Sequence, residues 1–366
     1  MASVCSGIIG LPNVGKSTFF NVLTGGKAQI ASFPFSTISP NVGTVSIPDN
    51  RLECLARVTN TDIITPAVVQ FIDVAGLVKG AHKGEGLGNE FLSRIRSMNV
   101  LAEVVRCFQG EKVAHCEGNI EPIRDIQIIE LELLLADLEI IGRKLAKAIQ
   151  PGISKSTKDK ERLDILEKAK AELEKGNSLR DFPFTEKEGC ELVKEGFLTF
   201  KPLIYIANID DNDLTSPSPL LQRLREHASI EGMEIIEICA QLELELEDLS
   251  QEERMEFLRE LKIRETGIDR LIKEVYKKLN LITFFTVSGG KEAKAWPVER
   301  GITASQAAGK VHSDMEKGFV KSEIIPVSEL LIIGSMKQAR EKGRVRIEGR
   351  DYLVEDGDVI HFRFSR

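Results

Sequence analysis

One short loop near the N-terminus has the residue types and spacing of a phosphate-binding site. Gly10-Leu-Pro-Asn-Val-Gly15-Lys16-Ser17 fits the pattern GxxxxGK[ST]. The backbone N–H groups of such a loop point inward and cradle phosphates, its Lys reaches the β- and γ-phosphates, and its Ser offers an oxygen to Mg²⁺. We therefore predict a nucleotide-binding loop made of Asn13, Val14, Gly15, Lys16, Ser17 and Thr18.

Two further segments supply groups that such a site needs around the γ-phosphate. Asp73-Val-Ala-Gly76 ends a run of β-branched and aromatic residues, where an acid holds the metal through water and the Gly76 N–H meets the γ-phosphate. In "FPFSTISPNVG" we choose Thr37 as the residue that binds Mg²⁺ only when the γ-phosphate is present. The neighbouring hydroxyl residues, which we rank lower, are Ser36, Ser39 and Thr44.

A later segment stands where guanine-selective proteins carry Asn-Lys-x-Asp. There the Asp accepts two N–H groups from guanine, and the Lys stem lies over the base. The segment here is Asn208-Ile209-Asp210-Asp211, in which Ile209 replaces the Lys. Asn208 still bonds a purine edge and Asp211 keeps the acid, so the residues alone leave adenine and guanine open. We place Asn208, Ile209 and Asp211 at the base.

These segments need a scaffold of alternating strands and helices. Apolar runs at residues 5–11, 68–74 and 100–108 read as buried strands separated by Gly-rich turns and helical stretches. This alternation is typical of a mainly parallel sheet with helices on both faces. Strand-like texture returns at 201–210 and 233–240, so we predict an α/β nucleotide-binding domain over 1–127 and 201–280.

Residues 128–200 interrupt that domain. Leu131, Leu134, Leu138, Ile141 and Leu145 recur at three- and four-residue steps, and a second helical pattern follows a Pro-Gly break. Two antiparallel helices joined at that tip, an inserted helical hairpin, are the simplest interpretation. From residue 281 to 366 short strands return, which predicts a small C-terminal α+β domain.

The segments quoted above, with "FIDVAGLVKGAHKGEGLGNEFL", "VVRCFQ" and "KPLIYIAN", resemble the YchF family of Obg-like ATPases over essentially the whole chain. The resemblance implies a P-loop hydrolase of the translation-factor-related class, with a C-terminal domain of TGS type. It also implies that ATP is hydrolysed more readily than GTP and that the protein associates with ribosomes.

Two positions depart from the family pattern. The family's base motif usually ends in Glu, whereas this chain has Asp211, the side chain that a guanine-specific site uses. The family's Ser-Ala pair after the last strand appears as Cys239-Ala240, and backbone contacts of Ala240 to the base need no hydroxyl. The first departure keeps GTP open as a substrate.

The usual water-orienting glutamine is missing after the Asp-x-x-Gly segment. Small GTP switches carry a water-orienting Gln after Asp-x-x-Gly, but this chain has Leu77, as the resembled family does. We predict that His115, in a loop where the family carries a His, aids hydrolysis together with Lys16, with His82 as its competitor. Asn13 makes K⁺ a second candidate cofactor beside Mg²⁺.

Composition limits the partners. The chain has 366 residues, a net charge of −7, and no run of eighteen apolar residues, so we expect neither DNA nor a membrane as a partner. Six scattered cysteines favour a reducing cytoplasm. Two basic clusters, seven Lys/Arg against two acids in 143–162 and six against two in 337–350, suggest ribosomal RNA contacts.

The sequence thus predicts a cytoplasmic, Mg²⁺-dependent P-loop ATPase that works as a slow ribosome-associated switch, with a monomer as the default. A GTPase of the same fold is the first alternative. The second is an RNA- or ribosome-binding module that uses nucleotide without hydrolysing it, which Leu77 favours. A small-molecule kinase ranks last, because the Asp-x-x-Gly and Thr37 segments suit a γ-phosphate switch.

Overall fold

The computed structural model describes residues 4–25, 29–30, 41–74, 87–110, 113–148, 157–247, 249–261, 263, 265–288 and 291–365. The chain forms two compact units. We call Cys5–Gly43 with Phe71–Leu271 the P-loop unit, and Met1–Val4, Thr44–Gln70 and Ile272–Arg366 the C-terminal unit. Three predicted residues, Thr37, Gly76 and His82, lie outside the described part.

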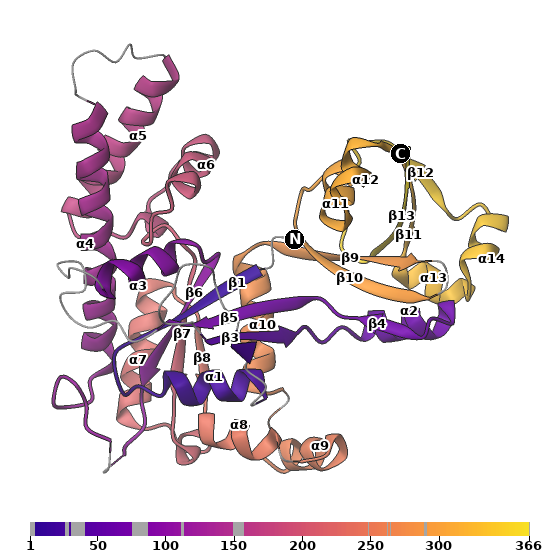
Figure 1. Cartoon of the computed structure of the whole chain (residues 1–366). Coiled ribbons are helices and arrows are strands. Elements are labelled where there is room, and N and C mark those ends of the chain that lie inside the picture. Colours follow the sequence, from indigo (N-terminus) through magenta and orange to yellow (C-terminus); the bar gives the residue numbers. More distant parts are fainter. Residues whose placement is uncertain are drawn as a thin grey trace. The chain divides into compact units, whose positions relative to one another are not determined.

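The described residues of the P-loop unit are built around a sheet with the order β2-β3-β5-β1-β6-β7-β8 (Figure 1). Its strands are β1 (Val4–Ile9), β2 (Gln29–Ile30), β3 (Asn41–Ser46), β5 (Val68–Asp73), β6 (Val100–Arg106), β7 (Leu203–Asn208) and β8 (Ile235–Ile238). Strand β6 pairs in parallel with β1 and β7, and β7 pairs in parallel with β8. Every residue of β6 and β7 is buried, which means that both faces of the sheet centre are covered.

Described helices accompany this sheet. They are α1 (Lys16–Thr24), α3 (Leu87–Arg96), α4 (Pro122–Ala148), α5 (Thr157–Glu174), α6 (Glu186–Glu195), α7 (Pro219–Glu231), α8 (Ala240–Glu247), α9 (Gln251–Glu260) and α10 (Gly267–Lys278). The last of them, α10, begins in the P-loop unit and ends in the C-terminal unit. Short 3₁₀ turns occur at Leu179–Asp181 and Asp211–Leu214. Helix α6 begins with a reciprocal Thr185–Glu188 capping box, as its Thr-x-x-Glu sequence predicts.

Helices α4 and α5 form the predicted helical arm (Figure 1). Helix α4 contacts α5, α7 and strand β6. Leu134 and Ile141 are buried against α5 and the segment after it, as the periodicity predicts. Leu131 was wrongly assigned to the buried face, since it is 53% exposed. The helix begins at Pro122 rather than near 128, and it contacts β6 and α7 as well as its partner helix α5.

The C-terminal unit has its own sheet, with the order β12-β11-β13-β9-β10-β4 in the described residues. Its strands are β4 (Ile63–Thr65), β9 (Leu281–Ser288), β10 (Glu292–Glu299), β11 (Phe319–Pro326), β12 (Arg346–Glu348) and β13 (Asp358–Phe364). Its helices are α2 (Asn50–Thr59), α11 (Ala304–Val311), α12 (Ser313–Lys317), α13 (Val327–Ile333) and α14 (Met336–Glu341).

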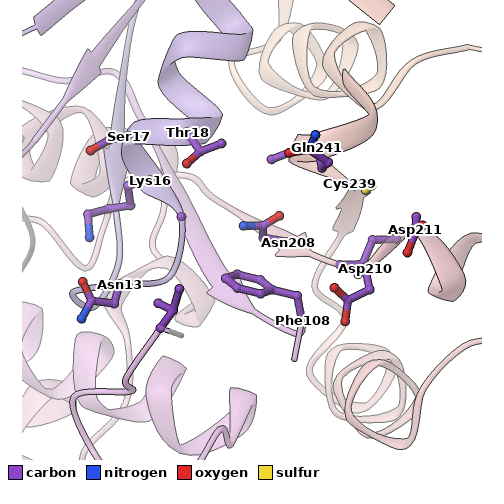
Figure 2. Close-up of a pocket in the computed structure, with 14 residues that line it drawn as sticks. Asn13, Lys16, Ser17, Thr18, Phe108, Asn208, Asp210, Asp211, Cys239 and Gln241 are labelled. Atoms are coloured by element: carbon purple, nitrogen blue, oxygen red, sulfur yellow. The ribbon is translucent and has the colours of Figure 1, made fainter. Parts of the chain in front are cut away.

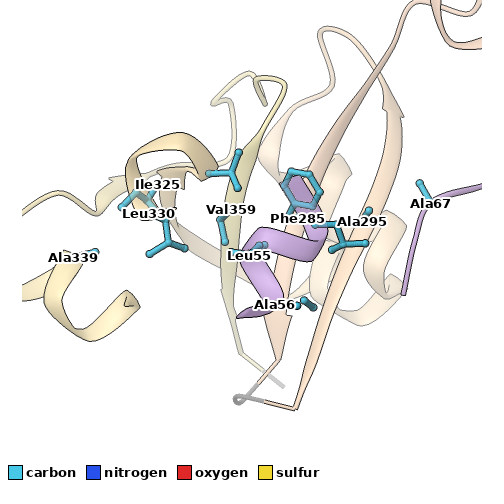
Figure 3. Close-up of a cluster of buried hydrophobic side chains, with 12 residues drawn as sticks. Leu55, Ala56, Ala67, Phe285, Ala295, Ile325, Leu330, Ala339 and Val359 are labelled. Atoms are coloured by element: carbon cyan, nitrogen blue, oxygen red, sulfur yellow. The ribbon is translucent and has the colours of Figure 1, made fainter. Parts of the chain in front are cut away.

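Residues 44–70 are part of this second unit, although the sequence-based division places them in the nucleotide-binding domain. Figure 3 shows Leu55 and Ala56 of α2 among the apolar side chains of β9, β11, β13 and α13. Strand β4 extends the same sheet by parallel pairing with β10. Local patterns identify α2 as a helix but do not reveal this packing, because the partner residues lie more than 200 positions away. The division into a nucleotide-binding domain, an inserted hairpin and a TGS-type domain stays a prediction.

Candidate nucleotide site

The glycines of the predicted phosphate loop are required by its backbone. Gly10 has φ +146° and Gly15 has φ +95°, and Asn13 adopts φ 62°. A side-chain Cβ at Gly10 would lie 2.6 Å from the Val104 carbonyl oxygen, and one at Gly15 would lie 2.3 Å from Nδ2 of Asn208. Positive φ and these close approaches exclude larger residues, so the loop turns tightly from β1 into α1. The first helical turn then begins at Lys16 with its free N–H groups on the loop side.

Lys16, Ser17 and Asp73 converge at the end of this loop. Lys16 is buried, and its Nζ donates to the Leu11 carbonyl at 2.6 Å. Burial lowers the Lys16 pKa to about 8, an effect that the nearby Asp73 carboxylate opposes. Burial raises the pKa of Asp73, against the Lys16 charge and hydrogen bonds from Asn41 and Ser17. A serine hydroxyl beside a carboxylate is the hard oxygen set that Mg²⁺ prefers, so Ser17 and Asp73 fit a magnesium ion.

A pocket of about 610 Å³ opens beside the loop (Figure 2). The predicted residues that line it are Asn13, Gly15, Lys16, Ser17, Thr18, Asn208, Ile209, Asp211 and Ala240. Val14 is buried beneath the loop instead, and its carbonyl accepts the Asn208 amide at 3.1 Å. The pocket therefore joins the phosphate loop to the ends of β7 and β8, where the base segment was predicted.

Phe108, Val113, Asp210 and Gln241 also line the pocket, although no motif in the sequence predicted a role for them. Phe108 and Val113 follow β6, the strand between β1 and β7. The carboxyl ends of adjacent parallel strands meet at one edge of a sheet. The strand "VVRCF" lies between two strands that carry site residues. This position could have predicted that Phe108, at its end, lines the pocket. In Figure 2 the Phe108 ring lies beside Asn208 and Asp210, where a flat purine can stack on it.

A buried arginine holds the segment that carries Phe108. Arg106 is 1% exposed, and its guanidinium donates to the carbonyls of Phe108 at 3.3 Å, Val113 at 2.9 Å and Gly110 at 3.4 Å. The guanidinium also lies 4.5 Å from the centre of the Phe108 ring. Burial lowers the Arg106 pKa, with Asp125 and Asp210 opposing. The Arg106 guanidinium thus fixes the backbone of the segment that carries Phe108 and Val113, which line the pocket.

The two acids of the base segment have different surroundings. Asp210 accepts the Gln109 N–H at 2.9 Å, so it ties β7 to the segment after β6. Asp211 is exposed, and its Oδ1 accepts the N–H of its neighbour Asn212 at 2.8 Å. Asp211 is therefore the more accessible of the two acids, while Asp210 has a structural contact.

The loop of His115 lies against the phosphate loop, but the His115 ring does not line the pocket. Asn13 Nδ2 donates to the Ala114 carbonyl at 3.1 Å, which joins the two loops. The ring itself is buried, with Nε2 2.8 Å from Oδ2 of Asp125 on α4. Its other nitrogen, Nδ1, accepts the Glu117 N–H at 3.1 Å. The backbone of His115 thus borders the site, whereas both ring nitrogens face protein groups.

The two basic clusters are partly neutralised by ion pairs. On the arm, Lys144 and Arg162 both pair with Glu195. In the C-terminal unit, Arg340 lies 2.8 Å from Glu323, and Arg344 lies 3.4 Å from Glu329. These acids lie outside the runs counted in the sequence, so each cluster offers less free positive charge than its own residues suggest.

The phosphate loop, Ser17 with Asp73, and the base pocket define a P-loop nucleoside triphosphatase. Among the described helices, none combines the length and apolar character needed to cross a membrane. The residues that the structure describes contain no group of three or more His, Cys, Asp and Glu side chains that could bind a metal.

Similar proteins make the assignment more specific. A family model described as 50S ribosome-binding GTPase matches residues 6–136, and the model YchF-GTPase_C, described as a protein of unknown function, matches 281–365. The ribosome-binding ATPase YchF of Bacillus subtilis is 44% identical over 371 residues, which cover 99% of this chain and 100% of the relative. The ribosome-binding ATPase YchF of Escherichia coli O157:H7 is 44% identical over 360 residues and 98% of each chain.

A solved structure is similar over nearly the full length. The structure of the Schizosaccharomyces pombe YchF GTPase has a TM-score of 0.85 and 33% identity, covering 99% of this chain and 98% of that one. The chain belongs to the YchF family, and its resemblance to that family is confirmed. The predicted P-loop fold with a C-terminal domain is confirmed as well.

Proposed function

We propose that this protein is a Mg²⁺-dependent ATPase that works as a slow, ribosome-associated switch in the cytoplasm. The observation that carries the proposal is the convergence of Lys16, Ser17 and Asp73 at one end of the pocket that Asn208 and Phe108 line at the other. The pocket is lined by groups that can bind the phosphates of a nucleotide and by groups that can bind its purine. Relatives named ribosome-binding ATPase YchF, 44% identical over almost the full chain, support the same function.

Each residue of the site has a defined task in this proposal. Lys16 and the N–H groups of residues 13–18 hold the β- and γ-phosphates, and Asn208 with Ile209, Asp211 and the Ala240 backbone holds the base. Ser17, Thr37 and Asp73 hold Mg²⁺, which when bound neutralises phosphate charge, and the Gly76 N–H meets the γ-phosphate. His115 aids hydrolysis by orienting water or accepting its proton, because Leu77 has no polar group for this.

The deciding experiment is steady-state hydrolysis of ATP and GTP by wild type, Lys16→Ala and His115→Ala, with nucleotide affinities measured in parallel. We expect ATP turnover above GTP turnover, loss of turnover in Lys16→Ala, and at least a tenfold fall in His115→Ala at unchanged ATP affinity. Absence of multiple turnover by wild type would instead support a non-hydrolysing nucleotide-gated module. Equal rates in Na⁺ and K⁺ buffers would remove K⁺ as a cofactor.

A GTPase is the second candidate, and Asp211 is the observation that favours it. Its carboxylate lines the pocket and is exposed, so it can accept N–H groups from guanine. The similar solved structure is also named a GTPase. Competition of ATP and GTP for the same site, measured by displacement of a fluorescent nucleotide, separates the two functions.

Ribosome association is proposed through ribosomal RNA, with the arm and a TGS-type C-terminal domain as the contacting parts. Basic residues outside the ion pairs described above carry this proposal, and phosphate contacts weaken as salt rises. Co-sedimentation with ribosomes at increasing salt tests it, and salt-independent binding would contradict it. No two cysteines of the described residues form a disulfide, which supports a reducing compartment. We expect a monomer, which sedimentation velocity measures.

A further inference from the structure

The His115 side chain is held from two sides inside the P-loop unit. Its Nε2 lies 2.8 Å from Oδ2 of Asp125, and the two side chains are only 1% and 4% exposed. Its Nδ1 accepts the Glu117 N–H at 3.1 Å. A carboxylate accepts hydrogen bonds and a backbone N–H donates them, so the proton must sit on Nε2 and the lone pair on Nδ1. The surroundings therefore select one of the two neutral tautomers of this ring.

The carboxylate that makes this selection is itself fixed. Arg124 donates to Oδ1 of Asp125 through Nη2 at 2.9 Å and through Nε at 3.3 Å. The same guanidinium donates to the side chain and the carbonyl of Asn119, each at 2.7 Å. Oδ1 is thus occupied by Arg124 and Oδ2 by His115, so Asp125 cannot rotate without breaking contacts on both sides.

The Nδ1 side of the ring faces a short turn. His115 and Gly118 form an isolated bridge, in which the Gly118 N–H donates to the His115 carbonyl at 3.1 Å. Gly118 has φ +87°, a conformation that glycine adopts without strain. Residues just before the turn touch the nucleotide site, since Val113 lines the pocket and the Ala114 carbonyl accepts from Asn13. If the turn opens when nucleotide binds, Nδ1 loses the Glu117 N–H and becomes free to accept a proton from water.

We propose that Asp125 is a positioning residue for hydrolysis: it keeps the Nε2–H tautomer of His115, so that Nδ1 is the nitrogen that acts. This inference rests on the proposed role of His115 and goes beyond it by assigning the nitrogen and its partner. Such an acid orients the imidazole and stabilises the imidazolium that forms when Nδ1 takes a proton. Asp125 lies in the first turn of α4, the helix that continues into the arm. The arm and the histidine are therefore joined through one hydrogen bond.

Asp125→Asn gives a sharp test because its amide cannot bond both Arg124 and His115 without disturbing the contact between His115 and the Glu117 N–H. Arg124 is a donor, so the amide oxygen must face Arg124 and the amide NH₂ must face His115. His115 would then need its lone pair on Nε2 and its proton on Nδ1. The Nδ1–H would face the Glu117 N–H, so two hydrogen-bond donors would oppose each other. The substitution keeps shape and volume while it favours the wrong tautomer or breaks the turn.

The experiment compares wild type, Asp125→Asn, His115→Ala and the double variant in full-length protein. ATP turnover, ATP affinity and thermal unfolding are measured for each, and ¹⁵N-histidine NMR reports which ring nitrogen carries the proton. With five histidines in the chain, the His115 signals are assigned by their loss in His115→Ala. Asp164→Asn, an exposed aspartate on α5, is the matched control and should behave as wild type.

We expect Asp125→Asn to lower kcat at least tenfold with ATP affinity within twofold of wild type, and to change the ring tautomer. In the His115→Ala background the same substitution should change kcat less than twofold. Wild-type turnover in Asp125→Asn, while His115→Ala is impaired, would overturn the inference and leave the proposed function standing. An equal fall of kcat in both backgrounds would make Asp125 merely structural and also overturn it. Normal turnover in His115→Ala would overturn the role of His115, and this inference with it.

Discussion

The side-chain amide of Asn208, the last residue of β7, donates to the carbonyl of Val14 in the phosphate loop at 3.1 Å. Both groups are buried, and the chain separates them by 194 residues. This bond fixes the base end of the pocket to its phosphate end. Gly15 follows directly, and the space that its missing side chain leaves is filled by the same amide.

Gly15→Ala should therefore abolish nucleotide binding. The new Cβ would lie 2.3 Å from Nδ2 of Asn208, and alanine is strained at φ +95°. We expect ATP affinity to fall at least a hundredfold, measured by calorimetry. Gly142→Ala is the control, since this α4 glycine has open space around it and should stabilise the helix by about 0.5–1 kcal/mol. Near-normal affinity in Gly15→Ala would mean that the loop does not bind phosphate in this conformation.

Substitutions of Asp210 and Asp211, the two acids of the base segment, should affect ATP and GTP affinity differently. Asp211→Ala removes the acceptor for guanine N–H groups, and a lost charged hydrogen bond of about 1.5–3 kcal/mol lowers GTP affinity about tenfold or more. ATP affinity should stay within threefold, because adenine does not present that pair of donors. Asp210→Ala releases the Gln109 N–H and should weaken both nucleotides. Displacement titrations with ATP and GTP measure this, and an equal loss of both in Asp211→Ala would disprove the assignment.

Glu103 should destabilise the folded protein at neutral pH. It is 1% exposed on β6, and Oε2 has no hydrogen-bond partner among the described residues. Burial, and next the Glu130 charge, raise its pKa well above the ordinary range. A raised carboxyl pKa favours folding below the unfolded-state value near 4.5, and that contribution is lost as pH rises towards the folded-state pKa.

The corresponding variant is Glu103→Gln. We expect it to raise the free energy of unfolding by about 1–3 kcal/mol at pH 8 and to change it little at pH 4.5, because the amide never ionises. Urea unfolding across that pH range measures the difference. Glu226→Gln, at an exposed position on α7, should have no such pH-dependent effect. A pH-independent gain would show that lost packing or hydrogen bonding, not ionisation, is responsible.

The C-terminal unit should depend on residues that precede it by more than 200 positions. Leu55 of α2 is fully buried among residues of β9, β13 and α13 (Figure 3). Leu55→Ala should cost about 2–5 kcal/mol of stability, as other buried Leu truncations do. Leu353→Ala, which is 58% exposed in the same unit, is the control. Thermal unfolding followed by the near-ultraviolet signal of Trp296 reports this unit, and an unchanged midpoint in Leu55→Ala would contradict the packing.

The sequence alone determined the phosphate loop, because its chemistry and its backbone are local. Gly10 and Gly15 are needed for positive φ, and Lys16 and Ser17 follow at fixed spacing before a helix. The buried strands β6 and β7 were equally predictable, since continuous apolar runs indicate a sheet covered on both faces. Family membership followed from the same short segments, which the full-length similarity confirmed.

Tertiary structure decided which distant residues meet. It joined Phe108 and Val113 to the base segment, because adjacent parallel strands end at one edge. It paired acids such as Glu195 and Glu323 with the basic clusters, and it packed Leu55 into the C-terminal core. It also gave His115 a buried partner, Asp125 on α4. The apolar periodicity of α4 does not predict that Asp125 faces this histidine. Contacts of this kind depend on the path of the whole chain, whereas a residue pattern reports only what its near neighbours require.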